Sequence, residues 1–405
     1  MSTNRPEARP PADLASRGMI AVLASQFLSA LADNALLFAA LALLKQEHHP
    51  AWAAPLIQEF FVGAYIVLAP FVGPFADSMP KGRVMLLANA LKLTGGLGMF
   101  LGLNPFLAYG LVGVGGAAFS PAKYGILSEL TSADRLVKAN SLMESFTIGA
   151  ILVGTVAGGT LADWSVEGAL AVVAICYGLA AATTLLIPRL EPAHRLAEFS
   201  LSAILIDFRD VMRELLRVTD ARFIIVGTSL FLGAGATMRF LLVAWVPVAF
   251  GVANNRVPAY LNAMIGVGIV AGAALAAKFV TIEKAERALP AGVLIGVVVC
   301  LLSGTTSLPI GFALMALIGA CGGFFVVPLN ALLQEKGHQT VGSGHAIAVQ
   351  NLAENSTMLV MIGLYSLIIR AGAPIGDVAV GFGAALSVAI ATIWAHWSRK
   401  RALSA

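Results

Sequence analysis

The sequence predicts an all-α polytopic membrane protein with twelve transmembrane helices in two six-helix bundles. Of its 405 residues, 58% are hydrophobic and only 12% are charged, whereas a soluble globular protein carries about 25% charged residues. Apolar stretches of about 20 residues, the length that crosses a bilayer as a helix, recur along the chain. One long polar stretch, 189–222, divides these spans six and six. A water-soluble protein is therefore excluded.

Each apolar span predicts one helix by its length and composition. The spans cover residues 18–44, 56–76, 84–103, 106–127, 138–162 and 167–187 in the first half, and 223–250, 257–280, 288–306, 309–333, 344–369 and 375–397 in the second. The domains expected from them are a cytoplasmic tail (1–17), a bundle (18–188), a cytoplasmic linker (189–222), a second bundle (223–398) and a cytoplasmic tail (399–405). The first tail lacks the apolar core of a signal peptide, so the first helix is expected to be retained.

The basic residues predict the orientation of the chain in the membrane. With the N-terminus inside, the cytoplasmic segments hold 20 of the 26 Lys and Arg residues, and the outer loops hold only Lys45, Arg256 and Arg370. The positive-inside rule therefore places both termini in the cytoplasm. The net charge of +4 reflects this topology. It does not indicate nucleic-acid binding, because no basic patch interleaved with aromatic residues is present.

The two halves of the sequence repeat each other. Phe27–Ala32 matches Phe231–Ala236, the set Gly115, Gly116 and Pro121 matches Gly322, Gly323 and Pro328, and the pair Glu144 and Thr147 matches Glu354 and Thr357. The three matches occur in the same order with a slowly drifting offset. They indicate duplicated halves, the parallel-repeat plan of many transporters.

Several motifs resemble known transporter families. The loop 73–83 has a glycine, an acid four residues later and a basic cluster, which resembles the signature of the major facilitator superfamily, although Ser78 and Pro80 depart from it. Longer strings closely resemble the bacterial lysophospholipid transporters, over roughly residues 18–397, and these strings lie at 25–38, 120–127, 323–335 and 348–356.

This resemblance implies a function and a partner. The function is transport of lysophosphatidylethanolamine, and of related lysophospholipids, from the outer to the inner leaflet of the bacterial inner membrane for re-acylation. The implied partner is a cytoplasmic acyltransferase and acyl carrier protein synthetase. That enzyme is fused to some relatives, but none of the six histidines here is followed five residues later by aspartate, so its usual motif is missing.

Ionisable residues inside the spans are the candidate substrate site, because a buried charge in a bilayer is costly and usually marks a pathway. Four or more residues from either end, the spans contain three acids, Asp33, Glu144 and Glu354, and three bases, Lys92, Lys123 and Arg239. Asp33, Arg239 and Glu354 lie deepest, so we expect them to face one cavity and to pair when it is empty.

Two interpretations of these deep charges are open. They could form a structural salt bridge between the halves. They could instead clamp a zwitterionic lipid, in which case Arg239 binds the phosphate and Asp33 or Glu354 accepts from the ammonium. Lys123 either contacts phosphate or snorkels to the interface. The remaining candidates are amides that bind the glycerol hydroxyl or join helices, and these are Asn34, Gln350, Asn351 and Asn355.

Two moving parts are also expected. Asp77 should pair with Lys81, Arg83 or a helix terminus in a gate at the cytoplasmic face. A lateral opening beside spans five and eight, or beside spans two and eleven, should let the headgroup slide while the acyl chain stays among the membrane lipids. In span eight, Gly266, Gly268 and Gly272 either give flexibility or allow tight packing.

Other chemistry is not indicated. No cofactor and no catalytic triad are expected. A metal site is not expected either, because the adjacent His48 and His49 have no third ligand nearby in the sequence. An enzyme is therefore not predicted. The alternative function is a proton-coupled facilitator that exports an amphiphilic drug or metabolite, with Asp33 or Glu354 carrying the proton.

Overall fold

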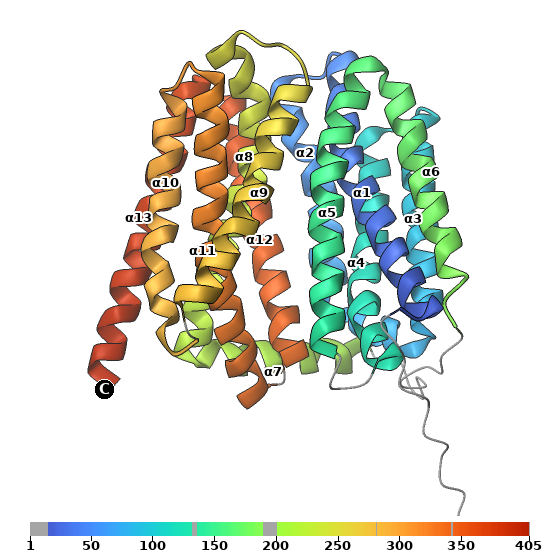
Figure 1. Ribbon diagram of the computed structural model, residues 1–405, viewed down its shortest axis with the longest axis vertical. Helices are drawn as coiled ribbons and strands as arrows, with labels where there is room; N and C mark the ends of the chain where they lie inside the picture. The colour runs from blue at the N-terminus through green and yellow to red at the C-terminus, as the bar shows by residue number, and fades with distance from the viewer. Residues whose placement is uncertain (1–14, 132–135, 189–200, 281, 342, 405) are drawn as a thin grey trace, which may run out of the picture.

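The computed structural model describes residues 15–404 except 132–135, 189–200, 281 and 342, and the described residues contain helices but no strands. Figure 1 shows all of these helices except α7 standing roughly side by side. They are α1 (Arg17–Gln46), α2 (Ala54–Ser78), α3 (Lys81–Phe100), α4 (Pro105–Leu130), α5 (Leu136–Trp164), α6 (Val166–Thr184), α7 (Leu201–Arg217), α8 (Thr219–Phe250), α9 (Arg256–Phe279), α10 (Leu289–Ser303), α11 (Leu308–Gln339), α12 (Ser343–Arg370) and α13 (Ile375–Ser404), with short 3-10 turns η1 (Ala51–Ala53) and η2 (Ile282–Ala288).

Each of the twelve predicted spans coincides with one helix, and α7 is an additional helix in the polar linker. Within the described residues, eleven helices are long and apolar enough to cross a membrane. The span that falls short is α3, which carries the polar residues Lys81, Arg83, Asn89 and Lys92. This helix still packs inside the structure, against α4 and α6.

Local sequence sets several helix ends. The side chain of Asn104 accepts hydrogen bonds from the first backbone N–H groups of α4, and Ser165 caps α6 in the same way. Gly251 ends α8 with a φ of 68°, which glycine adopts without strain. Helix α13 runs on to Ser404. The predicted tail 399–405 is therefore largely a continuation of that helix.

The helices pack in the same pattern in both halves. Helix α1 packs on α5 and α6, and α3 packs on α4 and α6. Their repeat partners do likewise, since α8 packs on α12 and α13, and α10 packs on α11 and α13. Pro121 of α4 and Pro328 of α11, which match in the sequence repeat, each lie inside their helix. Helix α7 lies across one end of the molecule (Figure 1).

Small residues bring α9 and α11 together. A side chain on Gly268 or Gly272 would overlap the α11 backbone at Ala316 or Ala320. Gly266 faces Leu152 of α5. Between the two alternatives for these glycines, the structure shows tight helix packing.

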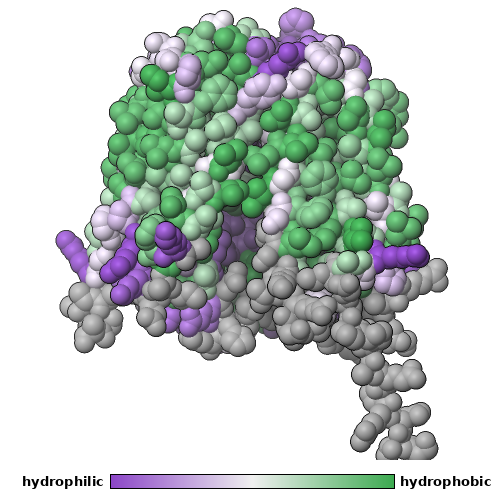
Figure 2. All heavy atoms as spheres, in the orientation of Figure 1, coloured by the Kyte–Doolittle hydropathy of each residue, from purple (hydrophilic) through white to green (hydrophobic). Residues whose placement is uncertain are grey.

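The two bundles meet along two seams, α5 with α9 and α2 with α12. Figure 2 shows, on the face in view, a broad apolar band and a hollow with polar lining between the bundles toward the α7 end. Where both partners are described, every hydrogen bond and ion pair between the bundles lies at the opposite end. The molecule is therefore closed at the end away from α7.

Candidate functional site

Asp33 lies in a polar cluster within the N-terminal bundle. The ammonium of Lys92, from α3, is 2.7 Å from Asp33 Oδ2 and donates to Ser29 Oγ at 3.0 Å. Tyr177 of α6 donates its hydroxyl to Asp33 Oδ1 at 2.7 Å. The side chain of Lys92 is 3% exposed. This pair therefore neutralises two charges that would otherwise be buried alone.

Glu354 lies in a second cluster, within the C-terminal bundle. It accepts from Gln350 Nε2 at 2.8 Å, one turn earlier on α12. The same amide lies 2.7 Å from Asn330 Oδ1 on α11 and 3.2 Å from Thr228 Oγ1 on α8. Among the described residues, Glu354 has hydrogen-bond donors but no cation at ion-pair distance. Gln350 thus links α12 to α11 and α8. This arrangement corresponds to the helix-joining alternative that the sequence left open for the amides.

Arg239 of α8 is the third deep charge, and it belongs to neither cluster. No described residue forms an ion pair or hydrogen bond with its guanidinium. The charges of Arg239 and Asp33 both act on the hydroxyl of Tyr109 of α4. The expected pairing of Arg239 with Asp33 or Glu354 is therefore not formed in this structure, in which Asp33 pairs with Lys92 and Glu354 accepts from neutral donors of its own bundle.

The other candidate polar residues are placed separately. Asn34 donates to the carbonyl of Ala30 at 2.8 Å, and Asn355 donates to the carbonyl of Asn351 at 2.7 Å. Both amides thus bond their own helix rather than another one. Asn351 is exposed, and the Lys123 ammonium lies 4.6 Å from the ring centre of Tyr124.

The expected gate is only partly described. The side chain of Asp77 lies outside the described residues, as does that of Glu144. Lys81 is buried and donates to the carbonyl of Ala76 at 3.1 Å, and Arg83 is exposed. Lys81 therefore bonds the last turns of α2.

Three tyrosines near Asp33 were missed by reasoning from the sequence. Tyr109 and Tyr177 are buried and Tyr65 is half-buried, and the charge of Asp33 acts on all three hydroxyls. Phe61 extends the aromatic surface, with its ring centre 5.3 Å from that of Tyr65 and 5.2 Å from that of Tyr109. A tyrosine in an apolar span looks like a core residue, so only the three-dimensional arrangement relates these hydroxyls to the carboxylate.

Asp163, at the end of α5, was also missed. Its Oδ1 accepts from the backbone N–H of Asn255 at 2.8 Å, and its Oδ2 accepts from that of Arg256 at 3.2 Å. The Arg256 Nε is also 3.2 Å from Oδ2, which makes an ion pair without hydrogen-bond geometry. A carboxylate of one bundle thus caps α9 of the other, where the helix dipole favours a negative charge.

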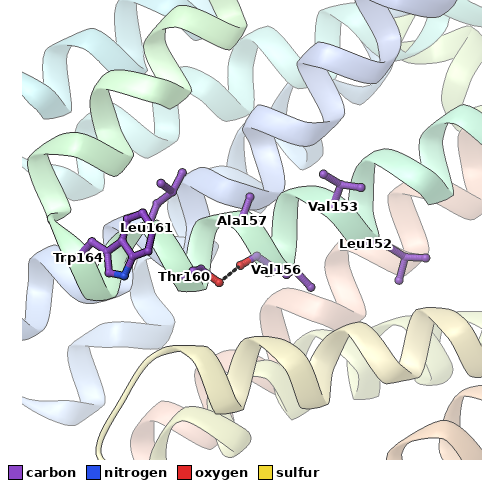
Figure 3. Close-up of a pocket in the computed structure, with 7 residues that line it drawn as sticks. All are labelled: Leu152, Val153, Val156, Ala157, Thr160, Leu161 and Trp164. Atoms are coloured by element: carbon purple, nitrogen blue, oxygen red, sulfur yellow. Dashed lines mark hydrogen bonds between the residues drawn. The ribbon is translucent and has the colours of Figure 1, made fainter.

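An apolar groove of about 600 Å³ runs along α5 (Figure 3). Its lining comes from this one helix and consists of Leu152, Val153, Val156, Ala157, Thr160, Leu161 and Trp164. Thr160 forms a 3.0 Å hydrogen bond with Tyr260 of α9, so the groove borders the α5–α9 seam. A lining of this kind suits a hydrocarbon chain. In the described residues, no group of His, Cys, Asp and Glu could hold a metal ion.

Comparisons with known proteins agree on a transporter family. The family model for the Major Facilitator Superfamily matches residues 22–376. The lysophospholipid transporter LplT of Enterobacter sp. (strain 638) is 55% identical over 397 residues, which cover 98% of this chain and 100% of that protein. The protein of that name from Klebsiella pneumoniae (strain 342) is 56% identical over 388 residues, or 96% of this chain and 98% of that protein.

Solved structures show the same fold. A POT family transporter in complex with a thioalcohol-conjugated peptide has a TM-score of 0.77 at 14% identity, covering 96% of this chain and 98% of that one. The nucleoside transporter NupG has a TM-score of 0.70 at 10% identity, covering 93% and 98%. The family match and the named relatives show that the protein is a multi-pass membrane transporter and not an enzyme. The chain belongs to the major facilitator superfamily and, within it, to the family of the bacterial lysophospholipid transporters.

Proposed function

We propose that this protein moves lysophosphatidylethanolamine and related lysophospholipids from the outer to the inner leaflet of the bacterial inner membrane. The observation that carries the proposal is the Arg239 guanidinium, which lies deep in the membrane span without an ionic partner among the described residues. A planar fork of N–H donors matches the oxygens of a phosphate group. The names of the relatives, at 55 and 56% identity, support the same substrate class.

In this proposal two carboxylates can accept hydrogen bonds from the ammonium of the headgroup. Asp33 is 23% exposed and accepts a hydrogen bond from the hydroxyl of Tyr177. Aromatic rings next to a carboxylate favour an organic cation through their negative faces. Glu354 is the second acceptor, because only neutral donors contact it among the described residues. In this proposal Asn34, Asn351, Asn355 and Lys123 line the route of the headgroup.

The acyl chain needs no polar path. The groove on α5 is almost wholly apolar and open along its length. A chain that lies there stays in a hydrocarbon environment, so its burial in the polar hollow is avoided. Headgroup and tail therefore follow different surfaces of the same protein.

The orientation and partner belong to the same proposal. The excess of basic residues in the inner segments favours cytoplasmic termini. With that orientation, α7 lies at the cytoplasmic end and the hollow opens toward the cytoplasm. A lysolipid delivered there would meet the cytoplasmic acyltransferase and acyl carrier protein synthetase that re-acylates it.

The test measures uptake of labelled lysophosphatidylethanolamine into proteoliposomes that contain the Arg239→Lys variant or the unaltered protein. Lysine keeps the charge but loses the two-pronged geometry, so uptake should fall about tenfold with the folded yield unchanged. Arg213→Lys on exposed α7 is the matched control and should transport normally. Full uptake by the Arg239 variant would remove the phosphate assignment.

A second candidate is a proton-coupled exporter of an amphiphilic drug or metabolite, and Glu354 favours it because the carboxylate is 9% exposed and has no counter-ion among the described residues. The same proteoliposomes distinguish the two functions. Uptake of lysolipid without a proton gradient supports the lipid transporter. Transport of an amphiphilic cation that needs the gradient, with no lysolipid uptake, supports the exporter.

A further inference from the structure

The two donors that hold Asp33 differ in charge and lie on different helices. Lys92 of α3 contacts Oδ2 and brings a positive charge, whereas the hydroxyl of Tyr177 of α6 contacts Oδ1 and brings none. Each oxygen of a carboxylate can accept two hydrogen bonds. The side chain of Asp33 is 23% exposed, so its carboxylate keeps acceptor positions for a further donor.

Lys92 is anchored by contacts besides the one to Asp33. Its ammonium donates to Ser29 Oγ at 3.0 Å and lies 5.2 Å from the ring centre of Phe119. Its stem passes Gly115 of α4, where an added methyl group would be 2.7 Å from Lys92 Cγ. The ammonium is therefore fixed between α1, α3 and α4. Any adjustment within the ion pair has to come from the carboxylate, which can turn about its own bond.

Tyr177 restricts that turn. The residue is 0% exposed, and its ring lies against Gly96 of α3, where an added methyl group would be 3.2 Å from Cδ2. Its hydroxyl is 2.7 Å from Asp33 Oδ1. A lysine ammonium next to a free carboxylate can contact both oxygens, but here the hydrogen bond to α6 engages Oδ1. Lys92 donates to Oδ2.

We infer that Tyr177 is a positioning residue for the lipid headgroup. Its hydroxyl holds the carboxylate of Asp33 so that Lys92 engages one oxygen and the exposed part of the carboxylate stays open to the ammonium of the lipid. Without the hydroxyl, the carboxylate turns towards Lys92 and pairs with it through both oxygens, and this closer pair binds an ammonium less well. The inference rests on the proposed function and adds to it a residue that acts through Asp33 without touching the substrate.

The test measures initial rates of lysophosphatidylethanolamine uptake into proteoliposomes over a range of lipid concentrations. Tyr177→Phe keeps the ring and removes the hydroxyl, so KM should rise about tenfold, the scale of one hydrogen bond to a charged group, while the maximal rate stays within about twofold. The matched control is Tyr365→Phe, which removes the hydroxyl of a buried tyrosine of α12 and should leave KM unchanged. The melting temperature of Tyr177→Phe should fall no further than that of the control, because the ion pair becomes closer.

The outcomes separate this inference from the proposed function. A lower melting temperature and a lower maximal rate at unchanged KM would mean that Tyr177 only supports the fold, and would overturn the inference, as would no change at all. If the unaltered protein takes up no lysolipid, the proposed function itself fails. Should Tyr177→Phe not give a monodisperse protein, Gly96→Ala pushes the ring from its place while keeping the hydroxyl, and it must raise KM for the inference to stand.

Discussion

The two bundles treat their buried acids in opposite ways. In the N-terminal bundle, Asp33 has a lysine at 2.7 Å and a tyrosine hydroxyl at 2.7 Å. In the C-terminal bundle, Glu354 has the amide of Gln350 and, among the described residues, no cation. Arg239, which could neutralise either acid, pairs with neither. The duplicated halves thus share a helix arrangement but not a charge arrangement.

This difference distinguishes charges that stabilise the fold from charges that can bind a substrate. Removal of one partner of a buried ion pair leaves an uncompensated charge, which is strongly destabilising. An acid held only by neutral donors loses little structure when its charge is removed, because the hydrogen bond can be kept. The comparison therefore assigns the pair of Asp33 and Lys92 a structural contribution, beside the contact proposed between Asp33 and the headgroup, and it leaves Glu354 and Arg239 without a counter-ion among the described residues.

The largest effect is expected from Lys92→Met. The substitution leaves Asp33 without its counter-ion, so unfolding should become easier by about 3 kcal/mol, seen as a lower melting temperature in detergent. The double variant Asp33→Asn with Lys92→Met should recover most of the loss. Lys278→Met, at an exposed helix end, is the control. If Lys92→Met melts like the unaltered protein, the pair does not stabilise the bundle.

Glu354→Gln should show the opposite profile. The amide keeps the size of the side chain and can still hydrogen-bond Gln350 and Thr228, so the melting temperature should stay within the range of a neutral substitution, about 0.5 kcal/mol. Lysolipid uptake should fall about tenfold if the carboxylate receives the ammonium. Loss of stability with normal uptake would reverse the comparison between the two bundles.

A smaller effect is expected from Asp163→Asn, which tests the closed end. Asparagine can accept from one backbone N–H but cannot pair with Arg256 or favour the α9 dipole. The population with separated ends should therefore grow several-fold, by a change of about 1 kcal/mol.

Spin labels at Leu101 and Thr306, in loops of the two bundles at that end, would measure this population by their distance distribution. Asp377→Asn is the control, because Asp377 lies in the first turn of α13 and is exposed. An unchanged distribution in Asp163→Asn would mean that the cap does not hold the seam.

Much of the fold follows from the sequence alone. Twelve apolar spans, their division at 189–222 and the repeat of Pro121 with Pro328 each depend on local composition or spacing. A bilayer requires about 20 apolar residues and internally bonded backbone groups, so such a span has few alternatives to a helix. The same local reasoning found the deep charges Asp33, Glu354 and Arg239, because a charge within such a span is conspicuous.

The partners of those charges were decided by the tertiary structure. Lys92 meets Asp33 across 59 residues of chain, and the sequence names no partner for it because pairing depends on how each helix is rotated about its axis. Tyr109, Tyr177 and Asp163 gain their meaning in the same way, from a neighbour on another helix. Hydropathy fixes which segments enter the membrane, whereas packing in three dimensions decides which polar groups meet there and which stay available for a ligand.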